Sequence, residues 1–322
     1  MKDPVGKPED YTPNLATLKG INFVIPMQFA GLRLDQALAK LAPDHSRSRL
    51  QSWIRDEKVK LDGGPCHIRQ KVWGGESVFI EDSPDPAETA HAPQDIELSV
   101  LYEDGFLIVI DKPAGLVVHP GSGNREGTLL NALLHHASSL STIPRAGIVH
   151  RLDKETSGLL VVAKTLSAQT SLVRQLQGRT VKRQYAALVH GIVKQDGTVD
   201  APIGRHPAHR TKMAVVGSGK SARTHYSVIE TFSGCTLLEC SLESGRTHQI
   251  RVHMQHIGHP LVGDPVYGKK PLPSENSALL SAFPRQALHA RRLSFVHPEN
   301  GELMTFESGL PEDLARLLEK LK

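Results

Sequence analysis

The sequence predicts an α+β fold whose main domain has a largely antiparallel mixed β-sheet with flanking helices. Many short β-type runs follow residue 96, without the regular strand–helix alternation of a parallel sheet. A smaller unit with two amphipathic helical patterns and short strands precedes them. A stretch rich in proline and acidic residues separates the two regions and is typical of a linker. We therefore predict two domains in 322 residues.

The first part of the chain predicts a loose extension at 1–20 and a small α/β domain at 21–80. The extension is polar and broken by prolines. Apolar spacing predicts helices in GLRLDQALAKL and in SRSRLQSWIRD, the second capped by Ser46. KVKLDGGPCH predicts two strands joined by a turn, and VWGGESVFI predicts one more. We expect a linker at 81–95.

Residues 96–322 predict the main domain. Its helices are expected in TLLNALLHHA, AQTSLVRQLQ, HQIRVHMQHI and LPEDLARLLEKL. Its strands are expected in LSVLYED, FLIVIDKP, AGLVVHP, GIVHRL, GLLVVAK, QYAALVHG, HYSVIETF and TLLECSLES.

Composition indicates an ordinary globular protein, with 39% hydrophobic and 22% charged residues. No apolar run approaches the roughly 20 residues of a membrane span, and the N-terminus lacks the apolar region of a secretory signal. We therefore expect a cytoplasmic protein that does not bind membranes. Cys66, Cys235 and Cys240 are predicted to be buried thiols, the last two on opposite faces of one strand.

Two glycine-rich motifs and a group of histidines do not predict a cofactor or a metal. PGSGNREGT has the spacing GxGxxxG instead of GxGxxG, and GSGKS lacks the first glycine and the following helix of a P-loop. His248, His253, His256 and His259 have arginine neighbours and no carboxylate among them, which disfavours a metal ion. We expect a polar helix near RNA or surface histidines there, and no cofactor.

A basic segment between Ala201 and Ile229 contains no acidic residue. Uncompensated cations repel each other unless a polyanion is near, so this segment predicts a phosphate-facing surface. Its cations are Arg205, Arg210, Lys212, Lys220 and Arg223, and His206, His209 and His225 accompany them.

The most informative stretch is GIVHRLDKETSGLLVVAK, in which Asp153 lies on a polar turn between two apolar runs. Turn statistics alone favour a structural role for such an aspartate. HRLDKETSGL, however, resembles the catalytic signature of the RluA family of pseudouridine synthases. KRQYAALVHG and SGRTHQIRVHMQHIGHPLVGDPVYG resemble two further blocks of that family, in the same order. PRAGIVHRLDK, RHPAHRTKMAV and HPLVGDPVYG resemble its RluD-type branch most.

The resemblance implies roles for individual residues. Asp153 would be the essential carboxylate, Tyr185 would stack on the flipped uracil and assist proton removal, and Arg251 would pair with the aspartate. Arg246 would bind phosphate or hold its loop, and Arg151 would hold the displaced base or its vacated place. Residues 31–62 resemble an S4-like RNA-binding module, although Leu61–Asp62 departs from its usual V-N-G. The module would contact phosphates through Arg33, Arg47, Arg49, Arg55 and Lys58.

The resemblance implies that the partner is ribosomal RNA or the large ribosomal subunit, with the helix 69 stem-loop as the expected site. We expect a monomer that needs no nucleotide cofactor. Three alternatives stay open: the same chemistry on another ribosomal site or on transfer RNA, a non-catalytic RNA-binding assembly factor, and a nucleotide-dependent enzyme that uses GSGKS.

Overall fold

The computed structural model describes residues 20–42, 47–81, 92–121, 124–209, 211–268 and 273–322. The chain divides into two compact units, Met1–Thr89 and Ala90–Lys322. Most of the predicted linker, the extension at 1–19 and the predicted cap Ser46 lie outside the described residues. Within the described ranges, no helix is long and apolar enough to cross a membrane.

The first unit is a four-stranded antiparallel sheet, in the order β1-β4-β2-β3, with two helices. Both predicted helices are present, and their apolar faces pack with the sheet into one core. The strand β1 was not predicted, because it begins at the end of the polar extension. The elements are β1 (Gly20–Val24), η1 (Met27–Phe29), α1 (Leu34–Leu41), α2 (Arg47–Arg55), β2 (Val59–Leu61), β3 (Gly64–Pro65) and β4 (Ser77–Glu81).

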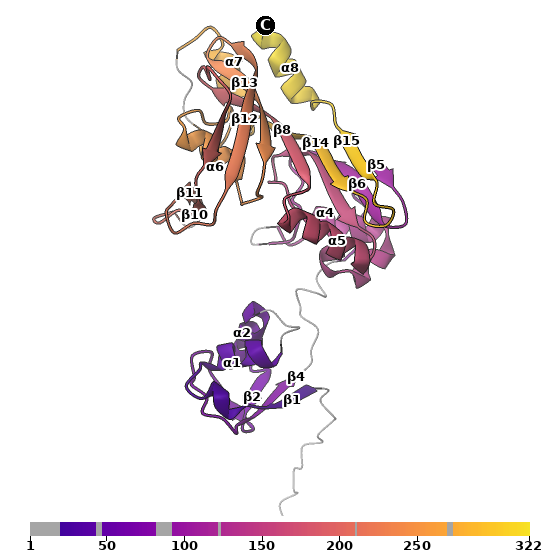
Figure 1. Cartoon of the computed structure of the whole chain (residues 1–322), viewed down its shortest axis with the longest axis vertical. Coiled ribbons are helices and arrows are strands. Elements are labelled where there is room, and N and C mark those ends of the chain that lie inside the picture. The colour runs from indigo at the N-terminus through magenta and orange to yellow at the C-terminus, as the bar shows by residue number, and fades with distance from the viewer. Residues whose placement is uncertain (1–19, 43–46, 82–91, 122–123, 210, 269–272) are drawn as a thin grey trace, which may run out of the picture. The chain divides into compact units, whose positions relative to one another are not determined.

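The second unit contains a nine-stranded sheet in the order β5-β6-β7-β14-β8-β13-β12-β9, with β15 paired to β14. All neighbours are antiparallel except β7 and β14, so the sheet is mixed and the predicted fold class is confirmed. Figure 1 shows β8, β13 and β12 side by side. The strands are β5 (Ser99–Glu103), β6 (Leu107–Lys112), β7 (Ser157–Ala163), β8 (Lys182–His190), β9 (Gly197–Asp200), β12 (Arg223–Phe232), β13 (Cys235–Leu242), β14 (Leu288–Val296) and β15 (Leu303–Glu307).

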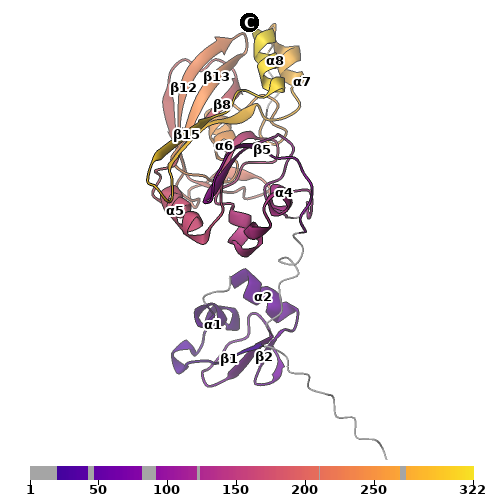
Figure 2. The same ribbon diagram turned by 90° about the vertical axis from the view of Figure 1, so that its right-hand side faces the viewer.

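Helices cover both faces of this sheet. The helices α4 (Leu129–His136) and α6 (Gln249–His256) share one core with one face. The helix α5 (Leu166–Gln177) and the pair α7 (Ser277–Ala282) and α8 (Glu312–Leu321) pack on the other face in two separate clusters. Figures 1 and 2 show α7 and α8 together at one end of the sheet. Strand alternation produces this division, because successive side chains point to opposite faces.

The four predicted helices of this domain are confirmed, and so is the prediction for the cysteines. All three cysteines are buried free thiols. Cys240 belongs to the core shared with α4 and α6, and Cys235 belongs to the core shared with α7 and α8. Five residues apart on β13, they therefore lie on opposite faces of the sheet.

Two predicted strands are wrong. GIVHRL makes only a single bridge, from Ile148 to Val162, after the 3-10 helix η3 (Pro144–Gly147). Gly147 has φ +76°, and a Cβ there would lie 1.8 Å from the carbonyl oxygen of Ala163. The chain therefore passes close to the end of β7 at Gly147 and does not run beside it as a paired strand. AGLVVHP likewise contributes one bridge, from Val117 to Thr128.

Several elements were not predicted, and the most important is the central strand β14. Its sequence contains two adjacent arginines, and a register shift between Ala290 and Arg292 interrupts its pairing with β8. A bulge breaks the two-residue alternation that a sequence pattern depends on. In the second unit the unpredicted elements are β9, β14, β15, α7, the 3-10 helix η2 (Ser138–Thr142), η3, and the hairpin of β10 (Ile203–Arg205) with β11 (Met213–Val215).

We predict that Gly158→Ala destabilises the second unit. Gly158 has φ +111°, pairs with Ala290 of β14, and would place a Cβ 2.3 Å from the carbonyl oxygen of Ala290. Overpacking of this kind costs about 1–3 kcal/mol. The midpoint of urea unfolding should fall accordingly. Gly105→Ala is the matched control, because its Cβ would meet nothing within 4 Å; equal stability of both variants would contradict the prediction.

Candidate active site

Asp153 lies on the turn that leads into β7. The carbonyl oxygen of Asp153 accepts a hydrogen bond from the backbone N–H of Thr156, and β7 begins at the next residue, Ser157. The Asp153 side chain is 17% exposed. A carboxylate placed in this way is partly desolvated but still reachable from outside the protein.

Lys112 holds the turn from the end of β6. Its side chain is 1% exposed, and its ammonium group donates to the carbonyl oxygens of Pro113, Leu116 and Lys154 at 2.7, 3.0 and 3.0 Å. Burial lowers the pKa of Lys112 to about 7, although the carboxylates of Glu155 and Asp153 oppose the shift. The Lys154 carbonyl follows Asp153 directly, so Lys112 fixes the backbone that carries the carboxylate.

Arg285 also holds this turn. One guanidinium N–H donates to the carbonyl oxygen of Glu155 at 3.0 Å. The Arg285 side chain is buried, and two further nitrogens bind the Asp313 carboxylate of α8 at 2.6 and 2.8 Å. The neighbouring residue Gln286 donates to the hydroxyl of Thr156 at 3.2 Å. The turn is thus attached to α8 through one buried arginine.

Arg251 connects Asp153 with a second carboxylate, Asp264. From the first turn of α6, its Nη1 donates to Asp153 Oδ2 at 3.0 Å. Its Nε and Nη2 bind the Asp264 carboxylate at 2.7 and 2.9 Å, in a bidentate pair. Burial alone would lower the pKa of Arg251, but the two carboxylates raise it. The guanidinium therefore stays charged although it is almost fully buried.

Asp264 is itself fixed by the chain that follows it. Its Oδ1 accepts the backbone N–H groups of Val266 and Tyr267 at 2.9 and 3.0 Å. Burial would raise the pKa of Asp264, but Arg251 and these N–H groups hold it below its ordinary value. The Tyr267 ring centroid lies 5.0 Å from the guanidinium carbon of Arg251. Sequence analysis missed both Asp264 and Tyr267, although the block HPLVGDPVYG contains them.

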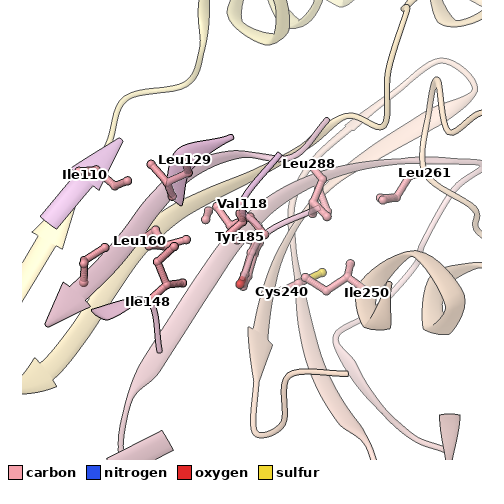
Figure 3. Packing of buried hydrophobic residues seen from close by; sticks show 14 of the residues in the cluster. Ile110, Val118, Leu129, Ile148, Leu160, Tyr185, Cys240, Ile250, Leu261 and Leu288 are labelled. Atoms are coloured by element: carbon pink, nitrogen blue, oxygen red, sulfur yellow. The ribbon is translucent and has the colours of Figure 1, made fainter. Parts of the chain in front are cut away.

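Tyr185 lies on β8 within the core shared with α4 and α6, and it is 6% exposed. Figure 3 shows its ring among apolar side chains that include Ile148 and Cys240. Burial raises the pKa of Tyr185, Arg183 lowers it, and the Asp153 carboxylate raises it further. The phenol therefore keeps its proton at neutral pH.

The remaining predicted residues of the second unit are less buried. Arg151 is exposed two residues before Asp153. Arg246 is half-buried, and its Nε donates to the carbonyl oxygen of Ser221 at 3.2 Å. Arg205 is exposed on β10, and Lys212 donates to the carbonyl oxygen of Val266 at 3.2 Å. Arg210 lies outside the described residues.

Two expectations for this region need correction. Arg223 is not an uncompensated cation, because it pairs with Asp200 at 2.5 Å and with Glu243 at 3.4 Å. The sequence pattern missed this because both carboxylates lie outside the basic segment. His253 is not a surface histidine: it is fully buried and bonds Thr224 and the carbonyl oxygen of Ala201. Within the described ranges, no three His, Cys, Asp or Glu side chains are grouped to hold a metal ion.

In the first unit, Arg33 and Arg47 share one buried carboxylate. Their guanidinium groups contact Asp35 at 2.9 and 2.6 Å and are themselves 39% and 47% exposed. Burial would raise the pKa of Asp35, but these arginines lower it. Arg55 is exposed at the end of α2, and Lys58 follows it. The side chain of Arg49 lies outside the described part of the structure.

Comparisons with known proteins agree on one family. A family model described as RNA pseudouridylate synthase matches residues 106–256. A protein of Nitrosomonas europaea named ribosomal large subunit pseudouridine synthase D is 60% identical over 303 residues, which cover 94% of this chain and 88% of the relative. A protein of the same name from Pseudomonas aeruginosa is 54% identical and covers 92% of this chain and 94% of its own.

Solved structures agree with this result. Human RNA pseudouridylate synthase domain containing 1 aligns with 74% of this chain and 97% of its own, with a TM-score of 0.53 and 25% identity. Human RNA pseudouridylate synthase domain containing 4 covers 69% and 92%, with a TM-score of 0.54 and 26% identity. On these grounds the chain belongs to the RluA-type pseudouridine synthases and is an RNA-modifying isomerase.

Proposed function

We propose that this enzyme converts uridines to pseudouridine in large-subunit ribosomal RNA, in the helix 69 stem-loop. The names of its relatives support ribosomal RNA as the substrate. The resemblance of the catalytic block to the RluD-type branch supports the helix 69 stem-loop as the modified site. Within the site, the observation that carries the proposal is the guanidinium of Arg251 between Asp153 and Asp264.

Asp153 is the proposed catalytic carboxylate. The reaction breaks the N1–C1′ bond of uridine, turns the uracil and rejoins it through C5. A carboxylate can attack C1′ or take a proton from C2′, and both chemistries need its ionised form. The guanidinium of Arg251 stabilises that charge in a partly desolvated place, and the bidentate pair with Asp264 fixes the guanidinium. The overall composition of the substrate does not change, so no redox cofactor is required.

Tyr185 and Arg151 are proposed to act on the uridine base. A uridine must leave its stack to reach Asp153, at a cost of about a few kcal/mol that loops and bulges reduce. The aromatic ring of Tyr185 offers a stacking face for the uracil, and its protonated phenol can relay the C5 proton. Arg151, exposed beside the turn, can hold the displaced base or its vacated position.

The remaining cations are proposed to bind phosphates. Arg246, Arg205 and Lys212 would contact the strand near the catalytic turn, with Arg210 as a further candidate. The first unit, proposed to be the S4-like RNA-binding module, would add sequence-independent affinity through Arg33, Arg47, Arg49, Arg55 and Lys58. Because Arg33 and Arg47 already share Asp35, the exposed Arg55 is the best candidate among them.

We predict that Asp153→Asn abolishes pseudouridine formation and leaves RNA affinity nearly unchanged. The amide is similar in shape but cannot attack C1′ or take a proton. The assay incubates the protein with a helix 69 hairpin, other ribosomal fragments and transfer RNA, and maps the modified positions. Asp95→Asn is the control, because that carboxylate is 91% exposed. Modification only outside helix 69 would reassign the substrate, and a wild-type protein that modifies none of them would favour an assembly factor.

We predict that Asp264→Asn lowers kcat about 100-fold, because Arg251 loses its bidentate partner and small misplacements near the reacting atoms are costly. Hairpin affinity should change little. Glu307→Gln is the matched control: it removes a carboxylate from an exposed pair with Arg292. Single-turnover rates on the hairpin measure the effect. Wild-type kcat in Asp264→Asn would show that Arg251 needs no such support.

We predict that the double variant Arg55→Ala/Lys58→Ala weakens binding to all RNA sequences alike. Each lost phosphate contact should reduce the slope of log affinity against log salt concentration by about one. Arg316→Ala/Lys320→Ala removes the same charge from exposed positions of α8 and serves as the control. RNA-binding titrations at several salt concentrations measure these slopes. Equal slopes for both double variants would exclude phosphate contacts by Arg55 and Lys58.

A further inference from the structure

His248 holds an unusual position immediately before α6. It is the N-cap residue of this helix and has φ 57° and ψ 25°, in the left-handed region that a side chain with a Cβ rarely adopts. Gln249 fixes the turn, because its Oε1 accepts from the Ser244 hydroxyl at 2.8 Å and from the backbone N–H of Arg246 at 3.0 Å. Strained residues that the surroundings hold in place are concentrated at functional sites.

Hydrogen bonds around Tyr267 determine which ring nitrogen of His248 carries a proton. The hydroxyl oxygen of Tyr267 accepts the backbone N–H of Met213 at 2.8 Å. Among the described residues, the only acceptor in contact with its own proton is Nδ1 of His248, also at 2.8 Å, so we assign the proton to this bond. With Nδ1 as an acceptor, the neutral imidazole carries its proton on Nε2.

The imidazole of His248 is held in this neutral form. Burial lowers the pKa of His248. The Asp153 carboxylate raises it, whereas the guanidinium groups of Arg251 and Arg151 lower it. The net shift is downward, so at neutral pH His248 presents a single N–H donor from Nε2.

That donor faces the oxygen of Asp153 that Arg251 does not bind. Arg251 donates to Oδ2, whereas His248 Nε2 lies 3.9 Å from Oδ1. This distance is too long for a direct hydrogen bond but allows a third oxygen atom to contact both groups. The two side chains are 21% and 17% exposed, so a ligand can reach them.

We propose that His248 Nε2–H donates a hydrogen bond to the 2′-hydroxyl oxygen of the target uridine and so selects ribose at that position. This inference rests on the proposed role of Asp153. Whether Asp153 attacks C1′ or takes a proton from C2′, its reacting oxygen meets one of these carbons. The 2′-hydroxyl oxygen is one bond from C2′ and two from C1′, and uracil O2 is three from C1′. The 2′-hydroxyl distinguishes RNA from DNA, so a donor at this place determines specificity.

The test is a double-mutant cycle in which one change removes the His248 imidazole and the other removes the 2′-hydroxyl of the substrate. Wild type and His248→Ala are each given a hairpin with the mapped target uridine as ribose or as 2′-deoxyribose, and single-turnover rates are measured. On ribose, His248→Ala should be about tenfold slower, the effect of one lost hydrogen bond. On the 2′-deoxy hairpin the two proteins should react equally fast. His248→Gln, whose amide can place an N–H near Nε2, should recover part of the rate on ribose.

The same cycle is measured as hairpin affinity in the Asp153→Asn background, where no turnover is needed. A coupling between His248 and the 2′-hydroxyl in either measurement supports the proposal. If His248→Ala has the same effect on both hairpins in both measurements, the proposal is wrong and the histidine is only structural or contacts another atom. His256→Ala, an exposed histidine on the same helix, should show no coupling. A wild-type protein without activity on the ribose hairpin would instead contradict the proposed substrate.

Discussion

The guanidinium of Arg251 shared by two carboxylates is the interaction on which the site depends. A buried arginine with one acid would satisfy its charge but not all of its donors, and partial burial of an unpaired carboxylate costs free energy. Asp264 occupies Nε and Nη2, so that Nη1 is left in a fixed direction for Asp153. The cluster carries a net negative charge, because one guanidinium faces two carboxylates. The more exposed carboxylate, Asp153, is the one proposed to react. The arrangement gives the Asp153 carboxylate a fixed cationic partner at Oδ2 without binding its Oδ1 to Arg251.

The sheet serves this interaction by bringing distant parts of the chain to one turn. Lys112 at the end of β6 and Arg285 just before β14 each bind a backbone carbonyl of the turn that carries Asp153. The close parallel pairing of β7 and β14 depends on Gly158, where a side chain does not fit. The backbone anchors thus fix the position of the turn that carries Asp153, whereas Arg251 supplies the positive charge beside its carboxylate.

Much of the fold could be predicted from the sequence, because amphipathic helices and alternating strands leave a local pattern. The resemblance also identified Asp153 and Arg251 as partners. The rest could not be predicted, for physical reasons. The strand β14 contains a bulge and two adjacent arginines, and the run before Asp153 crosses β7 at Gly147 instead of pairing with it. Asp264 and Tyr267 act through contacts with α6 that only the tertiary structure makes, and the tautomer of His248 depends on its hydrogen bond to the Tyr267 hydroxyl, 19 residues later.

The attachment of the turn to α8 through Arg285 and Asp313 has a consequence for biosynthesis. Asp153 emerges from the ribosome long before Asp313 does, and until then the guanidinium of Arg285 lacks the acid that holds it. A nascent polypeptide that already contains Asp153 can therefore hold its turn through Lys112 but not yet through Arg285 and α8. Completion of this anchor depends on a late helix, so the turn acquires its full set of contacts only after translation has reached α8.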